Sequence, residues 1–161
     1  MALTLITDRT QADVNRYYYF RNKKWSDLTS DEKSEWLAGL KGCYNYTDFQ
    51  RVENAVQYLS NLLNAEGYTN HVTISSSGTY THKYIRGREE IIQYLDNIAT
   101  LQEVYYNNLE IGTLPTIDSW LSYEGANIIE RILLDIEQMI ENMQAQWRYS
   151  NNLYVGEGYF S

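Results

Sequence analysis

Few side chains in this sequence have the types and spacing that chemistry at a shared site requires. His71 and His82 are eleven positions apart, which is not a common zinc-binding spacing, and no Gly-x-Ser-x-Gly turn is present to expose a nucleophile beside them. The single cysteine, Cys43, has no second cysteine in the chain to form a disulfide with. We therefore expect no metal site, no redox chemistry and no nucleophilic catalysis.

Adjacent acidic residues, which could act as a general acid and base, occur twice: Asp31 with Glu32, and Glu89 with Glu90. Both pairs fall in the first turn of an expected helix, where negative charge interacts favourably with the helix dipole. The Gly-rich stretches near Gly39 and Gly156 are not followed by the Lys-Ser/Thr and helix of a phosphate-binding loop. The sequence thus predicts a protein that is not an enzyme and needs no cofactor.

Charge and hydropathy exclude two classes of partner. The chain of 161 residues has 13 basic and 21 acidic side chains, a formal net charge of -8 that repels nucleic-acid phosphates and anionic lipid. No apolar run approaches the roughly 20 residues of a membrane-spanning helix. Asp8 and Arg9 interrupt the N-terminus before a signal peptide could form. We expect no nucleic-acid partner, no membrane insertion, and synthesis in a cytoplasm.

Aromatic residues are abundant, with 16 Tyr, 4 Trp and 3 Phe. Tyrosine suits interfaces, because its ring buries apolar area while its hydroxyl forms hydrogen bonds. The alternative is that the rings cover a thin helical core. Consecutive aromatic residues, as at 17–20, point to several sides of a helix, so another segment or subunit must cover some of them. Stacking on sugar rings is a second use for such clusters.

Helical periodicity and capping signals predict five helices, with bounds near 10–24, 29–42, 47–67, 88–106 and 124–147. Capping boxes are expected at Thr29 with Glu32 and at Thr47 with Gln50. The last helix must bury its apolar stripe on the third and fourth. The residues expected to face the core are Phe49, Val52, Val56, Leu59, Leu63, Ile91, Ile92, Leu95, Ile98, Tyr105, Ile129, Ile132, Leu133, Ile136, Ile140, Met143 and Trp147.

A shift of 77 positions places Glu53 on Glu130 and matches the apolar residues around them. Two similar helices could pair across a pseudo-twofold axis, but an amphipathic helix also produces such a match by coincidence. Each glutamate follows an inward-facing residue and could accept hydrogen bonds at the edge of the core. A solvated surface charge is the simpler expectation for both.

The predicted fold is all-α: a compact single-domain bundle of about five helices. Its two helical parts, 1–67 and 88–161, are joined by residues 68–87, and a small hairpin or irregular insertion is expected near 70–85. An aromatic tail, 148–161, should follow the last helix and pack on the bundle or on a neighbouring subunit. The residues expected to bind a partner there are Tyr149, Leu153, Tyr154, Tyr159 and Phe160.

Several segments at both ends of the chain have a recognisable pattern. They are Ile6 to Val14, Trp36 with Leu37 through Lys41 with Gly42, Tyr44 to Asp48, Arg51 to Val56, Ala126 with Asn127, Glu130 to Leu133, and the series Trp147, Tyr149, Ser150, Leu153, Tyr154, Gly156 and Glu157. In these segments the chain resembles structural proteins encoded in the tail modules of phages and prophages of Gram-positive bacteria. The resemblance is weakest at 68–88.

The resemblance implies a structural or adaptor subunit in the tail tip, baseplate or fibre region of a virion, made in the cytoplasm of the bacterial host. Its partners would be other phage tail subunits, with self-association as a further option. The resemblance supplies no catalytic residues. The alternative from another class is a receptor-binding module that recognises bacterial surface carbohydrate through exposed aromatic residues.

Overall fold

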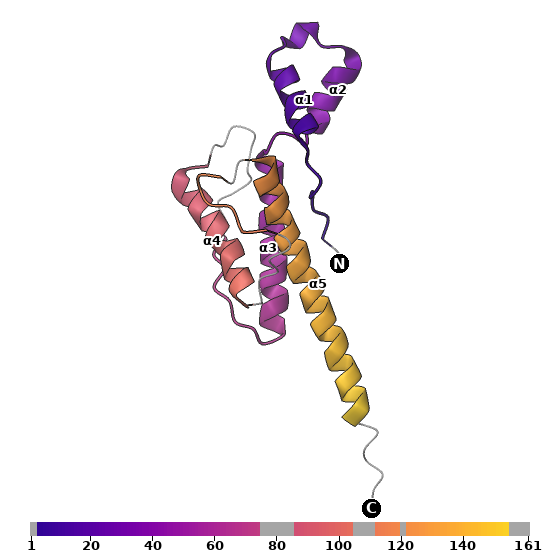
Figure 1. Ribbon diagram of the computed structural model, residues 1–161, viewed down its shortest axis with the longest axis vertical. Coiled ribbons are helices and arrows are strands. Elements are labelled where there is room, and N and C mark those ends of the chain that lie inside the picture. The colour runs from indigo at the N-terminus through magenta and orange to yellow at the C-terminus, as the bar shows by residue number, and fades with distance from the viewer. Residues whose placement is uncertain (1–2, 75–85, 105–111, 120–121, 155–161) are drawn as a thin grey trace, which may run out of the picture.

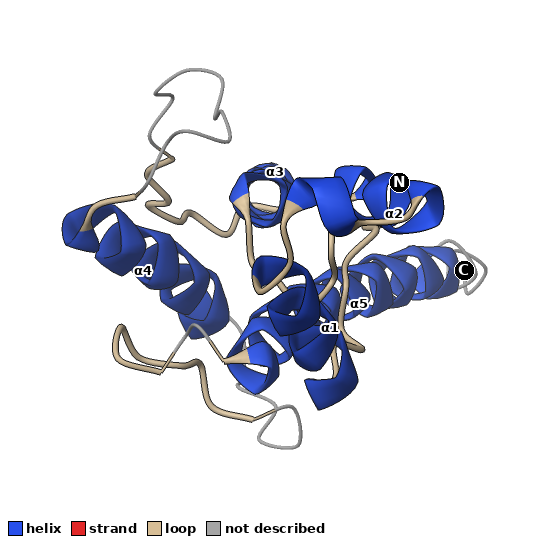
Figure 2. Cartoon of the chain, turned by 90° about the horizontal axis from the view of Figure 1, so that it is seen from above, coloured by secondary structure: helices blue, strands red, loops and turns tan. Residues whose placement is uncertain are grey.

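The structure is a computed structural model that describes residues 3–74, 86–104, 112–119 and 122–154, the side chains of 148–154 excepted. Every regular element within these ranges is a helix (Figure 2), so the all-α prediction of about five helices is confirmed. The expected insertion near 70–85 lies outside the described residues from residue 75 onward. The elements are α1 (Gln11–Arg21), the 3-10 turn η1 (Trp25–Asp27), α2 (Ser30–Ala38), α3 (Tyr46–Ala65), α4 (Arg88–Val104) and α5 (Tyr123–Tyr154).

Capping residues fix where the first helices begin. Thr10 and Thr29 cap α1 and α2 in reciprocal capping boxes, the second of them with Glu32 as expected. The capping box expected at Thr47 with Gln50 is wrong. Asn45 caps α3 instead, and the Asp48 carboxylate accepts the Asn45 backbone N–H at 2.8 Å. Asparagine is a stronger N-cap than threonine, and Asp48 stands three positions further on to return the hydrogen bond.

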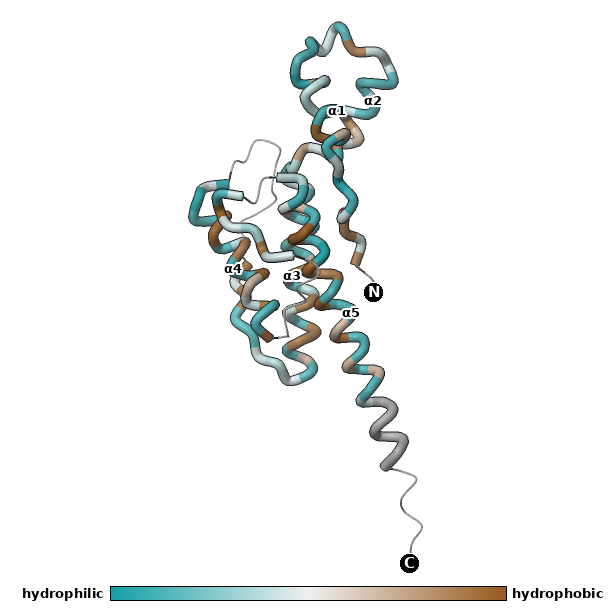
Figure 3. The backbone as a smooth tube through the Cα atoms, viewed as in Figure 1, coloured by the Kyte–Doolittle hydropathy of each residue, from teal (hydrophilic) through white to brown (hydrophobic). Residues whose placement is uncertain are grey.

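Helices α3, α4 and α5 pack on one another and enclose the main core, as expected for the last helix (Figure 1). Hydrophobic residues recur along all three helices (Figure 3). The expected core positions are buried with a few exceptions: Phe49, Ile92 and Met143 are half-buried, and Tyr105 lies outside the described residues. Tyr94, which the periodicity did not select, is a buried core residue. None of the described helices is both long and apolar enough to cross a bilayer.

Trp147 is the clear error in the expected core, because 63% of its surface is exposed. Helix α5 has 32 residues and α3 has 20, so their lengths are about 48 Å and about 30 Å. The C-terminal end of α5 therefore extends past the ends of α3 and α4 (Figure 1). The apolar periodicity of α5 continues to Trp147, but α3 and α4 end before they could cover this residue.

Residues 3–9 run in extended form along α5, which offers side chains to the backbone of this segment. The Leu3 N–H donates to the Glu137 carboxylate at 3.0 Å, and the Ile6 N–H donates to Glu130 Oε2 at 2.6 Å. Three extended residues and seven helical residues both span about 10 Å. The two glutamates on α5 therefore match the two amides in spacing.

A pair of Leu→Ala substitutions tests this assignment of the core. Leu59 is 0% exposed in α3 and Leu37 is 75% exposed in α2. We expect Leu59→Ala to lower the free energy of unfolding by about 2–5 kcal/mol, because it leaves a cavity. Leu37→Ala should stay within about 0.5 kcal/mol of the parent. Urea unfolding followed by circular dichroism measures both values, and equal losses would contradict the assignment.

Candidate functional site

A buried ionic network joins the N-terminal segment to α3 and α5. Arg9 Nη2 donates to Asp48 Oδ1 at 3.0 Å and to Glu130 Oε1 at 2.6 Å. Arg51 contacts the same two carboxylates, with Nη2 at 2.8 Å and Nε at 3.0 Å from the Glu130 oxygens. Arg9, Asp48 and Glu130 are buried. Two guanidinium groups thus neutralise two carboxylates, and three segments distant in the sequence meet at one point.

The Asn127 side chain holds the Arg9 backbone beside this network. Asn127 accepts the Arg9 N–H at 3.0 Å and donates to the Arg9 carbonyl at 2.8 Å. The pKa of Arg51 is lowered by burial, but its hydrogen bonds with Glu130 and Asp48 outweigh this effect and raise the pKa overall. The Arg51 guanidinium therefore stays charged, and we infer that the network fixes the backbone that leads into α1.

Glu53 and Glu130 are both buried, so the expectation that they are solvated surface charges is wrong. Glu53 forms a bidentate pair with Arg86, at 2.8 Å for each hydrogen bond. The Arg86 guanidinium also lies over the Phe49 ring, 4.4 Å from its centroid. Each glutamate occupies the edge of the core because an arginine from another segment reaches it.

A second polar contact in the core links two hydroxyls. The hydroxyl oxygens of Tyr44 and Tyr94 are 2.5 Å apart, and Phe49 packs edge-to-face against both rings. Burial raises the pKa of both phenols, so they remain protonated at neutral pH. We interpret this cluster as a packing element, because each hydroxyl can serve as the other's hydrogen-bond partner.

The α1–α2 hairpin, residues 10–42, lies beyond one end of the bundle (Figure 1). Its two ends cross at Gly42: a Cβ atom there would stand 2.1 Å from the Asp13 carbonyl oxygen, which only glycine avoids. Arg16 on α1 and Glu35 on α2 form a two-point ion pair, at 2.9 Å and 2.6 Å. These contacts hold the two arms of the hairpin together.

The hairpin has little core and much exposed aromatic surface. Among the described residues of 10–42, only Phe20 and Leu28 are buried hydrophobic side chains, with the Trp36 ring 5.7 Å from that of Phe20. Five of the eight large hydrophobic side chains that are exposed in the described structure lie on this hairpin: Tyr18, Tyr19, Trp25, Trp36 and Leu37. The consecutive aromatics at 17–20 thus divide as expected, with Phe20 covered and Tyr18 exposed.

The residues predicted to bind a partner lie further along, at the C-terminal end of α5. The helix does not stop at Trp147 but continues through Asn151 and Asn152 to Tyr154, so the expected tail begins later than residue 148. The side chains of Tyr149, Leu153 and Tyr154 lie outside the described structure, as do Tyr159 and Phe160 entirely. Their role remains a prediction.

The chemistry-bearing residues are not brought together in the described structure. His71 is exposed, and His82 lies outside the described residues. Burial raises the pKa of the Cys43 thiol, which disfavours the nucleophilic thiolate. Glu90 accepts the Gly87 N–H at 2.8 Å at the start of α4, as expected for a first-turn carboxylate. No group of three or more possible metal ligands occurs in the described ranges.

No protein-family model, curated protein or solved structure matches this chain. The candidate site comprises an aromatic hairpin, a buried ionic network at its base, and a three-helix bundle behind it.

Charge removal at the network has a defined expected effect. Glu130→Gln keeps the shape of the side chain but leaves Arg9 and Arg51 with less compensating charge in a buried place. We expect a loss of about 3–5 kcal/mol in the free energy of unfolding. Glu141→Gln, at an exposed position of the same helix, should change it by less than about 0.5 kcal/mol. Chemical denaturation of both variants checks this, and equal values would mean that the network contributes nothing.

Acidification should weaken the hairpin. The Tyr19 hydroxyl and the Thr29 backbone N–H donate to Glu32 and lower its pKa from 4.5 to about 2. A depressed pKa in the folded state gives stability that is complete above pH 4.5 and is lost as the pH falls toward 2. We expect Glu32→Gln to lower the melting temperature at pH 7 and to have a smaller effect at pH 2. A difference that does not change with pH would contradict this.

Proposed function

We propose that this chain is a non-enzymatic structural or adaptor subunit of a phage tail that binds neighbouring subunits through its α1–α2 hairpin. One observation carries the proposal: exposed aromatic side chains are concentrated on the part of the molecule that projects from the bundle. Large exposed apolar surface is unfavourable in water, and aromatic residues are the commonest anchors of protein interfaces.

The buried network suits an adaptor because it fixes where the hairpin stands. Arg9 directly precedes Thr10, the N-cap of α1, and Asp48 lies in the first turn of α3. Two chain segments connect the hairpin to the bundle. One lies next to Arg9, which contacts Glu130, and the other lies next to Asp48, which contacts Arg51. A fixed arm loses less conformational entropy on binding than a mobile one.

The phage part of the proposal is supported by the resemblance described above, and the structure gives its residues a common role. Arg9, Asp48, Arg51, Asn127 and Glu130 all lie in the similar segments, and all take part in the contacts at the base of the hairpin. The similar segments therefore supply the residues that hold the hairpin in place on the bundle.

Carbohydrate recognition is the second candidate. Trp25 is 51% exposed, and Lys33 Nζ is 5.8 Å from the centroid of its ring. An exposed indole beside a polar group could stack on a sugar ring. A glycan array with the purified protein separates this candidate from the first.

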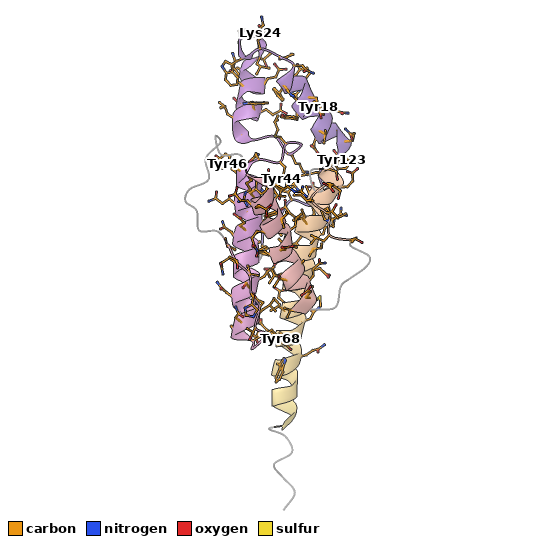
Figure 4. All side chains as sticks on the ribbon, turned by 90° about the vertical axis from the view of Figure 1, so that its left-hand side faces the viewer. Tyr18, Lys24, Tyr44, Tyr46, Tyr68 and Tyr123 are labelled. Atoms are coloured by element: carbon orange, nitrogen blue, oxygen red, sulfur yellow. The ribbon has the colours of Figure 1, made fainter. Side chains whose placement is uncertain are left out.

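The test of the adaptor role uses proteins encoded next to this gene. We expect at least one of them to be a tail protein that co-purifies with the chain when both are expressed together. Tyr18→Ala and Trp25→Ala should weaken that binding about tenfold or more, as at interface hot spots. Tyr46→Ala is the matched control, because Tyr46 is 38% exposed and Tyr18 49%, but Tyr46 lies at the start of α3 (Figure 4).

Three results would count against the proposal. Neighbouring genes without tail proteins would remove the phage assignment. Equal binding by the Tyr18 and Tyr46 variants would show that the hairpin is not the contact surface. Glycan binding that Trp25→Ala abolishes, without capture of a tail protein, would favour the receptor-binding candidate.

A further inference from the structure

Charge is unevenly divided between the hairpin and the rest of the chain. Residues 10–42 include six basic and five acidic side chains, whereas the remainder has seven basic and sixteen acidic ones. The hairpin therefore has a formal charge of +1 and the remainder -9, which together give the -8 of the whole chain. The two parts of the molecule therefore have net charges of opposite sign.

Three of the six basic residues of the hairpin lie at its outer end. Arg21 is the last residue of α1, and Lys23 and Lys24 follow in the turn toward α2, where Asp27 is the single acidic residue of the segment 21–27. Lys23 also forms an ion pair with Glu32 of α2, at 3.5 Å. Lys24 lies at the far tip (Figure 4). Trp25, which is exposed, follows directly. This tip, residues 21–25, thus combines positive charge with an aromatic anchor.

An acidic stripe runs along the outer face of α4. Glu89, Asp96 and Glu103 are exposed and stand seven residues apart, so they follow one side of the helix at intervals of about 10 Å. Ile92, which is half-buried, lies beside them on the same side. Ile91, Leu95 and Ile98 are buried in the core. The stripe therefore presents negative charge next to some apolar surface.

We propose that the hairpin tip of one copy of this chain docks on the α4 stripe of a second copy. This inference rests on the proposed function, because it names a partner for the same hairpin. The tip supplies positive charge and Trp25, and the stripe supplies negative charge and Ile92. Within one chain the hairpin points away from the bundle (Figure 1), so the contact forms between copies.

The contact joins two different surfaces, and every copy has both. Such a heterologous contact leaves one surface unused at each end of a pair, so it continues into a ring or an open filament. Opposite charges across the contact accelerate association and make it sensitive to salt. Self-association should therefore be strong at low ionic strength and weaken as sodium chloride is added.

Charge reversal on each surface tests the contact with the purified full-length chain. Sedimentation velocity measures association at about 20 mM and about 500 mM sodium chloride, conditions chosen to lengthen and shorten the screening length. We expect Lys24→Glu on the tip and Asp96→Lys on the stripe each to weaken self-association about tenfold or more. Glu141→Lys makes the same change in net charge as Asp96→Lys on the exposed face of α5, and it should leave association within about threefold of the parent.

The double variant Lys24→Glu with Asp96→Lys gives the decisive result. Each single variant reverses one charge on one surface, whereas the double variant again places opposite charges at positions 24 and 96 when the tip of one copy contacts the stripe of another. We therefore expect the double variant to recover association. If hairpin contacted hairpin or α4 contacted α4, the double variant would associate no better than the single variants, so the absence of recovery would overturn the proposal.

A parent chain that stays monomeric at low salt up to about 100 μM would also overturn it. The adaptor role would stand in that case if Tyr18→Ala and Trp25→Ala still weakened binding to a neighbouring tail protein. Conversely, self-association that the two charge reversals abolish, without any capture of a tail protein, would support the contact and not the phage assignment. The two proposals can therefore fail separately.

Discussion

The Glu130 carboxylate is the contact on which the arrangement of this molecule depends. It lies inside the structure, yet it accepts hydrogen bonds from Arg9, from Arg51 and from the Ile6 backbone. A carboxylate without those donors would be strongly destabilised by burial, so the N-terminal segment, α3 and α5 must meet for it to be satisfied. The position of the hairpin follows, because the chain enters α1 directly after Arg9.

The buried core and the exposed aromatic surface are divided between two parts of the chain. The bundle buries a continuous core of aliphatic side chains between α3, α4 and α5. The hairpin buries Phe20 and Leu28 among its described hydrophobic residues and uses surface pairs such as Arg16 with Glu35. Exposed ion pairs contribute little stability. The hairpin is therefore free to expose aromatic side chains, because the bundle supplies the core that a 33-residue segment (10–42) lacks.

Local sequence signals predicted the helices, but they did not predict the contacts between residues far apart in the sequence. Periodicity and caps such as Thr29 with Glu32 gave the fold class and most of the core, since both operate within a few residues. Arg9 reaches Asp48 and Glu130, which are 39 and 121 residues away, and no spacing rule reports such a pair. The match between Glu53 and Glu130 was the available signal, but it did not show which arginines would compensate them. Trp147 was misplaced because periodicity in α5 does not reveal where its neighbours end.

The interior ion pairs also determine the charge of the surface. Outside the hairpin there are seven basic residues, and Arg9, Arg51 and Arg86 are engaged by Asp48, Glu130 and Glu53 in and around the core. Removing these three balanced pairs leaves four basic and thirteen acidic residues for the rest of that part of the chain. Its outer face is therefore more one-sided in charge than its composition suggests. Three arginines form ion pairs in and around the core of the bundle, whereas two lysines lie at the hairpin tip. The ion pairs that compensate the buried carboxylates therefore also leave opposite net charges on the two parts of the molecule.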